Sequence, residues 1–309
     1  MPATDHCAVS FAVPAYNCEA TLAEAVLSIV HGNLHDGDEV LVVDDASTDG
    51  TPKLIQDLAA KFPAIKTLRH RYRKGSAAAG RNTAIEHSSH DLIFALDADN
   101  VLVEGSVVRL KERLKECQAD AATFQEIRYF TRTFDNVELK WLFPASEITL
   151  ADALCSHLWP GPSGNYLFTK ESWLRAGRYH EFIGGGIDSW AFAIRQLATG
   201  SKMVVTPKSH YFHRYGGETA HVRDVREGGI PRKALQVLLP FLDLINDEDV
   251  EYIMGKEGRL TWFDNLEERP LRLKSGLVGT HGESINPPPP PLVKRIIRRL
   301  KRMAAQRFV

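Results

Sequence analysis

Short apolar runs alternate with segments of helical pattern through the first half of the chain, and this alternation constrains the fold more than any other feature. The expected strands lie near 8–13, 39–44, 65–69 and 91–96, and the expected helices near 19–30, 51–61, 76–87 and 105–117. Short strands that alternate with helices are typical of a doubly wound α/β fold, in which helices cover both faces of a parallel sheet. We therefore predict such a sheet here.

The fourth apolar run ends in a pair of carboxylates. Residues 92–96 are all apolar, and Asp97-Ala98-Asp99 follows directly. Open α/β sheets bind ligands outside the carboxyl ends of their strands, and carboxylate oxygens suit Mg²⁺ or Mn²⁺ bridging a diphosphate. The alternative is a polar loop with two solvated acids.

Three further segments place polar or small residues where a ligand site is expected. The first strand leads into Pro14-Ala15-Tyr16-Asn17, and the second leads into the acidic turn Asp44-Asp45-Ala46-Ser47-Thr48-Asp49-Gly50-Thr51. Segment 74–82, which contains Gly75 and Arg81, opens a helix with small residues. Small side chains there let a backbone or a ligand come close.

Together these four segments resemble the inverting glycosyltransferases of family 2. That family's pattern is a V-P-x-Y-N start, a V-V-D-D-x-S-x-D-G-T second strand, a G-x-x-x-A-R-N-like helix and a D-A-D strand end, and all four occur here in order within residues 8–215. Gly80 is a mild departure, because the family more often has Ala there. The resemblance implies a GT-A type nucleotide-binding α/β fold, with a mostly parallel sheet flanked by helices. It also implies transfer of a sugar from a nucleotide-diphosphate sugar to an acceptor hydroxyl.

The resemblance implies a divalent metal, Mg²⁺ or Mn²⁺, that neutralises the diphosphate leaving group as a Lewis acid. Asp99 is the expected direct ligand, Asp97 contacts the ribose or the metal's water shell, and His213 completes the coordination. The alternative for His213 is an ordinary histidine at a strand end.

A second group of residues is expected to hold the nucleotide. By resemblance, Asp44 or Asp45 accepts the nucleobase imide N–H or a ribose hydroxyl, which favours uracil over cytosine because N3 of cytosine carries no proton. Tyr16 is expected to stack on the base, unless it is an ordinary packing aromatic. Arg81 is expected to reach the base or the phosphates, unless it is a helix surface residue. The full set is Pro14, Tyr16, Asp44, Asp45, Gly75, Arg81 and Asp97.

An inverting single displacement needs a carboxylate that faces the acceptor hydroxyl. The family usually supplies it from a Glu-Asp pair that opens a helix after a glycine-rich turn. The matching stretch here is Gly184-Gly185-Gly186-Ile187-Asp188, so Asp188 is the expected base and Glu181 its substitute. The alternative is that Asp188 only caps the helix. Because Ile187 replaces the Glu, a non-catalytic scaffold in a polysaccharide assembly complex is the second reading of the chain.

The second half of the chain is less regular. We expect strands at 121–129, 137–142, 163–168, 203–205 and 211–213, a helix at 189–199, and helical structure over 231–268. This pattern predicts a glycosyltransferase domain over 1–215, with a nucleotide-sugar half at 1–100 and an acceptor half at 101–215. A helical C-terminal extension over 216–285 and a spacer with a basic tail over 286–309 follow.

The tail is a distinct piece. Five prolines at 287–291 predict an extended spacer. Residues 292–309 hold seven Lys or Arg and no acid. The tail therefore contributes +7 to the net charge of −1, and the rest of the chain contributes −8. At ~100° per residue, the apolar residues fall within an arc of roughly 140°. They are Leu292, Val293, Ile296, Ile297, Leu300, Met303 and Ala304. This pattern is typical of a helix on an anionic bilayer; the alternative is a helix that docks on a partner or on the acidic body.

Other features bear on location. The four cysteines lack metal-ligand spacing, which favours a reducing compartment. No secretory pattern opens the chain, and no apolar run approaches the ~18 residues of a spanning helix. Near-neutral charge gives no pull toward nucleic acid. We therefore expect a cytoplasmic enzyme, peripheral on the inner membrane through its tail. Its expected role is cell-surface polysaccharide or glycolipid synthesis on a carbohydrate or lipid-linked acceptor.

Overall fold

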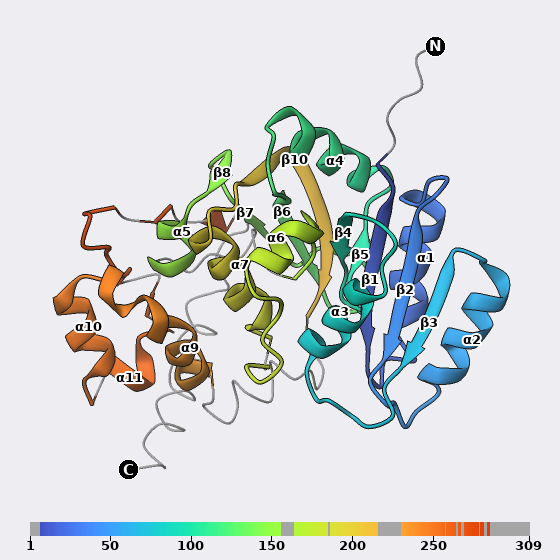
Figure 1. Cartoon of the computed structure of the whole chain (residues 1–309), viewed down its shortest axis with the longest axis horizontal. Helices are drawn as coiled ribbons and strands as arrows, with labels where there is room; N and C mark the ends of the chain where they lie inside the picture. The colour runs from blue at the N-terminus through green and yellow to red at the C-terminus, as the bar shows by residue number, and fades with distance from the viewer. Residues whose placement is uncertain are drawn as a thin grey trace.

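One mixed sheet of 11 strands forms the centre of the molecule (Figure 1). The computed structural model describes residues 7–155, 164–184, 186–215, 230–256, 258–263, 265–266, 269–277, 279–280 and 283–284. In the first half, β1 (Val9–Ala15) pairs in parallel with β2 (Glu39–Asp44) and β4 (Leu92–Ala95), and β2 pairs in parallel with β3 (Ile65–Arg69). The predicted α/β fold is confirmed.

Four helices separate these strands and cover both faces of the sheet. They are α1 (Leu22–Gly32), α2 (Thr51–Lys61), α3 (Ala77–Glu86) and α4 (Ser106–Glu116). Successive strand residues point to opposite faces, and in β1 Phe11 packs with α1, α2 and α4 whereas Ala12 packs with α3. Because both faces are buried, these strands have continuous apolar runs rather than alternating ones.

The second half adds antiparallel pairs. Strand β9 (Tyr166–Thr169) lies between β4 and β6 (Ala121–Phe130) and pairs antiparallel with both. On its other side, β6 pairs in parallel with β10 (Met203–Arg214). The shorter strands β5 (Val101–Leu102), β7 (Leu139–Leu142), β8 (Glu147–Ile148) and β11 (Glu283–Ser284) complete the sheet. The prediction of two short strands at 203–205 and 211–213 is wrong: they are one strand, β10. Its pairing shifts between Thr206 and His210, where Pro207 lacks a backbone donor.

Helices of the second half form a separate apolar cluster. The predicted helix at 189–199 is α7 (Asp188–Ala198), preceded by α5 (Leu150–Cys155) and α6 (Lys170–Arg175). The predicted helical stretch 231–268 is divided into α9 (Ile230–Leu238), a 3-10 helix (Leu239–Leu244), α10 (Asp247–Met254) and α11 (Gly258–Thr261). Pro240 and Gly255 interrupt it. Leu238 and Trp262 pack with Trp190 and Ile194 of α7, so the extension lies at the opposite end of the molecule from α2 (Figure 1).

The chain continues beyond these elements. The proline spacer and the basic tail lie outside the described residues, and the domain limits remain predictions. None of the described helices combines the length and the apolar character needed to cross a membrane. The four cysteines are unpaired thiols.

Gly80 sets how closely α3 approaches the sheet. A Cβ at residue 80 would lie 2.8 Å from Pro14 Cβ and 3.3 Å from Pro14 Cα. Real Cβ atoms do not approach a neighbour this closely, so α3 and β1 pack at a separation that only glycine allows. The departure from the family pattern at Gly80 therefore has a local steric cause.

Candidate active site

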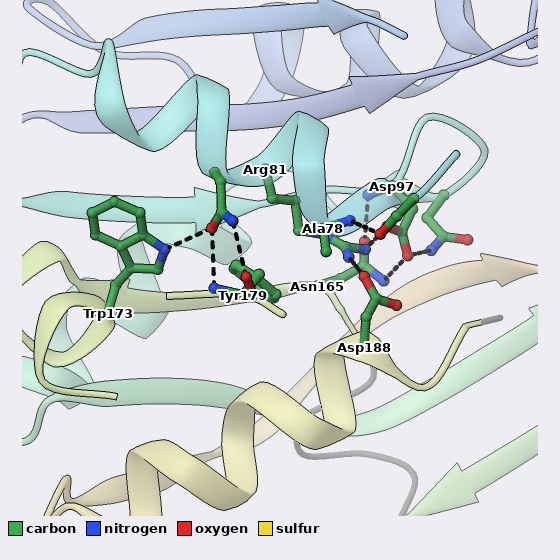
Figure 2. Close-up of polar contacts among 10 residues, drawn as sticks. Ala78, Arg81, Asp97, Asn165, Trp173, Tyr179 and Asp188 are labelled. Carbon is green, nitrogen blue, oxygen red and sulfur yellow. Dashed lines mark hydrogen bonds and ion pairs between the residues drawn. The ribbon is translucent and has the colours of Figure 1, made fainter. Parts of the chain in front are cut away.

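Arg81 joins two of the predicted site residues. Its Nη1 lies 2.6 Å from Asp188 Oδ2, and its Nη2 donates to Asp97 Oδ1 (Figure 2). Arg81 comes from α3, Asp97 lies two residues beyond the end of β4, and Asp188 is the first residue of α7. The side chains of Arg81 and Asp188 are 3% and 4% exposed. Residues far apart in the sequence thus form one buried ion cluster at the carboxyl edge of the sheet.

The cluster balances one cation against two carboxylates. Burial alone would lower the pKa of Arg81, but Asp97 and Asp188 raise it well above the ordinary value for arginine. The guanidinium therefore stays charged. Its Nε is buried without a hydrogen-bond partner. Removing one member of a buried ion group leaves an uncompensated charge, which typically costs about 3–5 kcal/mol.

Three residues that the sequence reasoning missed support this cluster. Gly164, with φ +103°, leaves room for the cluster, because a Cβ there would lie 3.0 Å from Asp97 Oδ2 and 3.3 Å from Arg81 Nη2. Asn165 Oδ1 accepts a 2.8 Å hydrogen bond from the Asp97 backbone N–H. The ring of Tyr179 lies under the Arg81 guanidinium at 5.4 Å. None of the three belongs to a motif with a general sequence signal.

Asp99 lies beside the cluster and forms no ion pair with any of the described residues. Burial together with the neighbouring Asp97 raises the pKa of Asp99 to about 7, although the charges of Arg214 and Arg81 lower it. Asn100 Nδ2 lies 3.4 Å from both Asp97 Oδ2 and His213 Nδ1. Asn100 therefore connects His213 to the Asp97 carboxylate.

A metal ion at this site would need ligands from substrate phosphates as well as from the protein. No three potential ligands among His, Cys, Asp and Glu gather into a ready-made metal site within the described residues. Mg²⁺ is usually held by one or two carboxylates plus substrate phosphates and water, rather than by a cage of protein ligands. Asp99, which forms no ion pair with a described residue, and the nearby Asp97 fit that kind of shared site.

Asp45 and Gly75 contact each other rather than the ion cluster. The backbone N–H groups of Lys74 and Gly75 donate to the two Asp45 oxygens at 2.8 Å each. His70 Nδ1 lies 2.7 Å from Asp45 Oδ1, and its Nε2 lies 2.9 Å from Thr83 Oγ1. Asp45 therefore holds the loop between β3 and α3. His70, which completes this network, was also missed.

Asp44 and Tyr16 make their contacts outside the ion cluster. Ser47 N donates to Asp44 Oδ1 at 2.9 Å. Asp44 Oδ2 is buried and makes no hydrogen bond, but Arg69 Nε forms an ion pair with it at 3.2 Å. Tyr16 is half-buried, and the Arg73 guanidinium stacks on its ring at 4.1 Å. Tyr16 is therefore not an aromatic of the core. Pro14 packs on Gly80, as described above.

Asp188 and Glu181, the expected base and its substitute, lie in different surroundings. The cap of α7 is Ile187, without a side-chain hydrogen bond, so the reading of Asp188 as a helix cap is wrong. Glu181 is exposed and accepts from Asn82 Nδ2 at 3.1 Å, apart from the Arg81 cluster. Trp190, two residues after Asp188, is a core residue whose Nε1 donates to Ala153 O at 2.8 Å.

Solved structures of glycosyltransferases share this fold. TarS 1–349 of Staphylococcus aureus aligns with a TM-score of 0.60 and 16% identity, over 84% of this chain and 73% of that one. The mannosyltransferase PcManGT of Pyrobaculum calidifontis, solved with GDP-Man and Mn²⁺, aligns with a TM-score of 0.55 and 21% identity, over 84% and 72%.

Curated relatives and a family model agree with the structural likeness. The GalNAc(5)-diNAcBac-PP-undecaprenol beta-1,3-glucosyltransferase of Campylobacter jejuni is 25% identical over 255 residues, 81% of this chain and 76% of that protein. UDP-Glc:alpha-D-GlcNAc-diphosphoundecaprenol beta-1,3-glucosyltransferase WfgD of Escherichia coli is 35% identical over 95 residues, 31% of this chain and 36% of that protein. The family model for Glycosyl transferase family 2 matches residues 10–174, more than half of the chain. The chain therefore belongs to glycosyl transferase family 2 and has the GT-A fold.

Proposed function

We propose that the protein moves a sugar from a UDP-linked donor to an acceptor hydroxyl with inversion at the anomeric carbon. The observation that carries the proposal is the placement of Asp188. Its Oδ2 is held by Arg81, and its Oδ1 has no hydrogen bond from the described residues. A buried carboxylate with one oxygen fixed and one available suits a general base.

The reaction needs one proton transfer and one displacement. Asp188 takes the proton of the acceptor hydroxyl as that oxygen attacks the anomeric carbon. The bond from that carbon to the diphosphate oxygen breaks on the opposite face, and the nucleoside diphosphate leaves with the electron pair. Arg81 is a positioning residue in this scheme, because its guanidinium is already engaged by Asp97 and Asp188.

Charge on the leaving diphosphate must be neutralised. Asp99, with Asp97 beside it and His213 behind Asn100, would hold Mg²⁺ or Mn²⁺, which supplies Lewis-acid stabilisation of the leaving group. The buried Asp99 carboxylate, which forms no ion pair with a described residue, supports this assignment. The Mn²⁺ present in the PcManGT complex is further support.

The nucleotide half of the site favours uracil. Asp44 Oδ2, a buried oxygen that forms an ion pair with Arg69 and makes no hydrogen bond, would accept the imide N–H of uracil once Arg69 moves aside; cytosine N3 lacks that proton. Tyr16 offers a ring for stacking once Arg73 moves. WfgD is named for UDP-Glc, and TarS has been solved with UDP-GlcNAc.

The acceptor is proposed from the relatives and from the tail. Two curated relatives are named for acceptors linked to undecaprenol through a diphosphate, which supports a lipid-linked acceptor in surface glycan synthesis. The basic amphipathic segment 292–309 would bring the enzyme to an anionic bilayer.

The test is a panel of nucleotide sugars, assayed for Mn²⁺-dependent hydrolysis and for transfer to diphosphate-linked lipid acceptors, with wild type and Asp188→Asn. UDP sugars should be turned over by wild type only, while both proteins bind UDP. Absence of turnover with every donor, together with intact UDP binding, would favour the scaffold reading. A preference for another nucleotide would reject the role of Asp44.

A further inference from the structure

A groove of about 630 Å³ lies between α1, β5 and the end of β10. Its apolar lining includes Leu27, Val103, Phe134 and Phe212, and Glu24 and Glu104 also line it. The α1 residues that face it are 24, 27, 28 and 31, which form one stripe of a helix. A different stripe of α1, which includes Leu22, Val26 and Ile29, is buried in the core. One side of α1 thus remains available to an amphipathic helix that lies along it.

The charges of the groove favour a cationic occupant. None of the described residues that line it is Lys or Arg, and His31 is its third titratable group besides the two glutamates. Glu24 is paired with Arg214. Glu104 is exposed and has no ion-pair partner within the described part of the chain. An occupant with an apolar face and flanking cations would match this lining.

The chain itself carries such a segment, and the sheet brings it within reach. The pairings Ser284↔Trp141, Trp141↔Ile127, Ile127↔Tyr211 and Tyr211↔Leu102 form a single row across β11, β7, β6, β10 and β5. With strands ~4.8 Å apart, Ser284 and Leu102 are separated by about 19 Å along the sheet. Residues 285–291 include the five prolines, and seven residues in polyproline geometry span about 22 Å at ~3.1 Å each.

We infer that segment 292–309 docks as a helix in the groove along α1, with its apolar arc against Leu27, Val103 and Phe212. Its cations would then lie near Glu104 and Glu24. The inference does not depend on glycosyl transfer. Because the groove and a bilayer would bury the same apolar arc, each state excludes the other.

The test measures how fast trypsin cuts the tail of the full-length protein, with cuts at residues 294–307 counted by mass spectrometry. Val103→Arg places a cation in the groove, and Ile297→Asp places a charge on the apolar arc. Both should speed tail cleavage about tenfold, the factor expected for a loss of ~1.4 kcal/mol of docking. Glu104→Lys, on an exposed residue, provides a second groove variant if Val103→Arg does not fold. Leu174→Arg, an exposed leucine on α6 that is 55% accessible, is the matched control and should leave the rate unchanged.

Binding to lipid vesicles is the second measurement. If the groove holds the tail, Val103→Arg or Glu104→Lys should bind anionic phosphatidylglycerol vesicles more strongly than wild type, and Leu174→Arg should not. Equal cleavage rates in the folded groove variants and wild type, or unchanged vesicle binding, would overturn the inference and leave the bilayer as the only site of the tail.

Discussion

At the scale of single residues, Arg81 is the side chain whose role changes most between sequence and structure. The family pattern places it against the nucleotide, whereas its guanidinium contacts Asp97 and Asp188. A planar guanidinium can hold two carboxylates at once in a fixed geometry, which a lysine ammonium cannot reproduce.

Arg81→Lys should therefore lower kcat and leave UDP affinity nearly unchanged. The charge is kept, but Asp188 loses its fixed orientation, and misplacing a catalytic group by ~1 Å can cost about 10²-fold in rate. Steady-state kinetics and calorimetric UDP binding would separate the two effects. Arg73→Lys is the contrast, since Arg73 stacks on Tyr16 and should alter UDP affinity. A raised Kd for UDP in Arg81→Lys, with kcat intact, would show instead that Arg81 contacts the nucleotide.

Asp188→Asn should reduce kcat by roughly 10²–10⁴, the usual contribution of a general base. Donor binding should persist because Asp188 is not in the proposed nucleotide group. If Glu181→Gln shows that loss while Asp188→Asn retains activity, the base is Glu181.

Asp99→Asn should remove the Mn²⁺ dependence of UDP binding while the metal-free affinity changes little. Asp99 lies beside the cluster and forms no ion pair with a described residue, so in the variant a cation bound with the diphosphate would lose its protein ligand. Calorimetry of UDP with and without Mn²⁺ measures this directly. A variant that still shows the full metal effect would place the metal elsewhere.

Residue-level prediction was possible where a residue lies in a family motif. Asp97, Asp99, Arg81 and Asp188 were identified in this way, and the structure brings Arg81, Asp97 and Asp188 together. Asn165 and Gly164 were not identified, because their role depends on β9 lying antiparallel to β4, a pairing that no local pattern encodes. The contact of Arg81 with Asp188 likewise joins residues 107 positions apart.

At the scale of elements, the edge of the sheet opposite the site has its own polar clamp. Glu39, at the start of β2, accepts from Ser10 Oγ at 2.6 Å on β1, from Lys66 Nζ at 2.5 Å on β3 and from Ser89 N at 2.5 Å after α3. Burial by itself would raise its pKa, but these hydrogen bonds and the Lys66 charge lower the pKa of Glu39 to about 2 from its ordinary 4.5. The clamp ties β1, β2, β3 and the end of α3 together.

This shift predicts a pH-dependent contribution to stability. The folded-state pKa is depressed, so the stabilisation by Glu39 is fully present above about pH 4.5 and is lost as the pH falls toward 2. Urea unfolding should show Glu39→Gln less stable than wild type at pH 7, with the difference shrinking below pH 4.5. Asp57→Asn, in an exposed pair with Lys53, should show little effect at either pH. A difference that does not change with pH would exclude the clamp as its source.

Element positions in the first half were predicted well because each strand there is a short run between polar turns, and three of the four are almost entirely apolar. The second half was harder. The strand β10 continues through Pro207 because it pairs with β6 on both sides of the irregularity. Strand pairing of this kind outweighs the tendency of a proline to interrupt a strand.

At the scale of the whole molecule, membrane binding is assigned to the tail and catalysis to the body. Ending the chain after Asn286 should abolish binding to anionic vesicles and leave transfer to a soluble acceptor intact, because the proposed catalytic residues all lie at or before residue 213. Each lysine or arginine near an anionic surface contributes about 1 kcal/mol, so high salt should release the full-length protein. Co-sedimentation at low and high salt tests this, and equal binding by the shortened chain would reject the tail as the anchor.

The contact between Pro14 and Gly80 also limits which residues position 80 tolerates. A Cβ at position 80 would lie 2.8 Å from Pro14 Cβ, so Gly80→Ala should destabilise the fold by about 1–3 kcal/mol, as overpacking typically does. Any larger side chain at this position therefore requires a compensating change that lets β1 and α3 move apart.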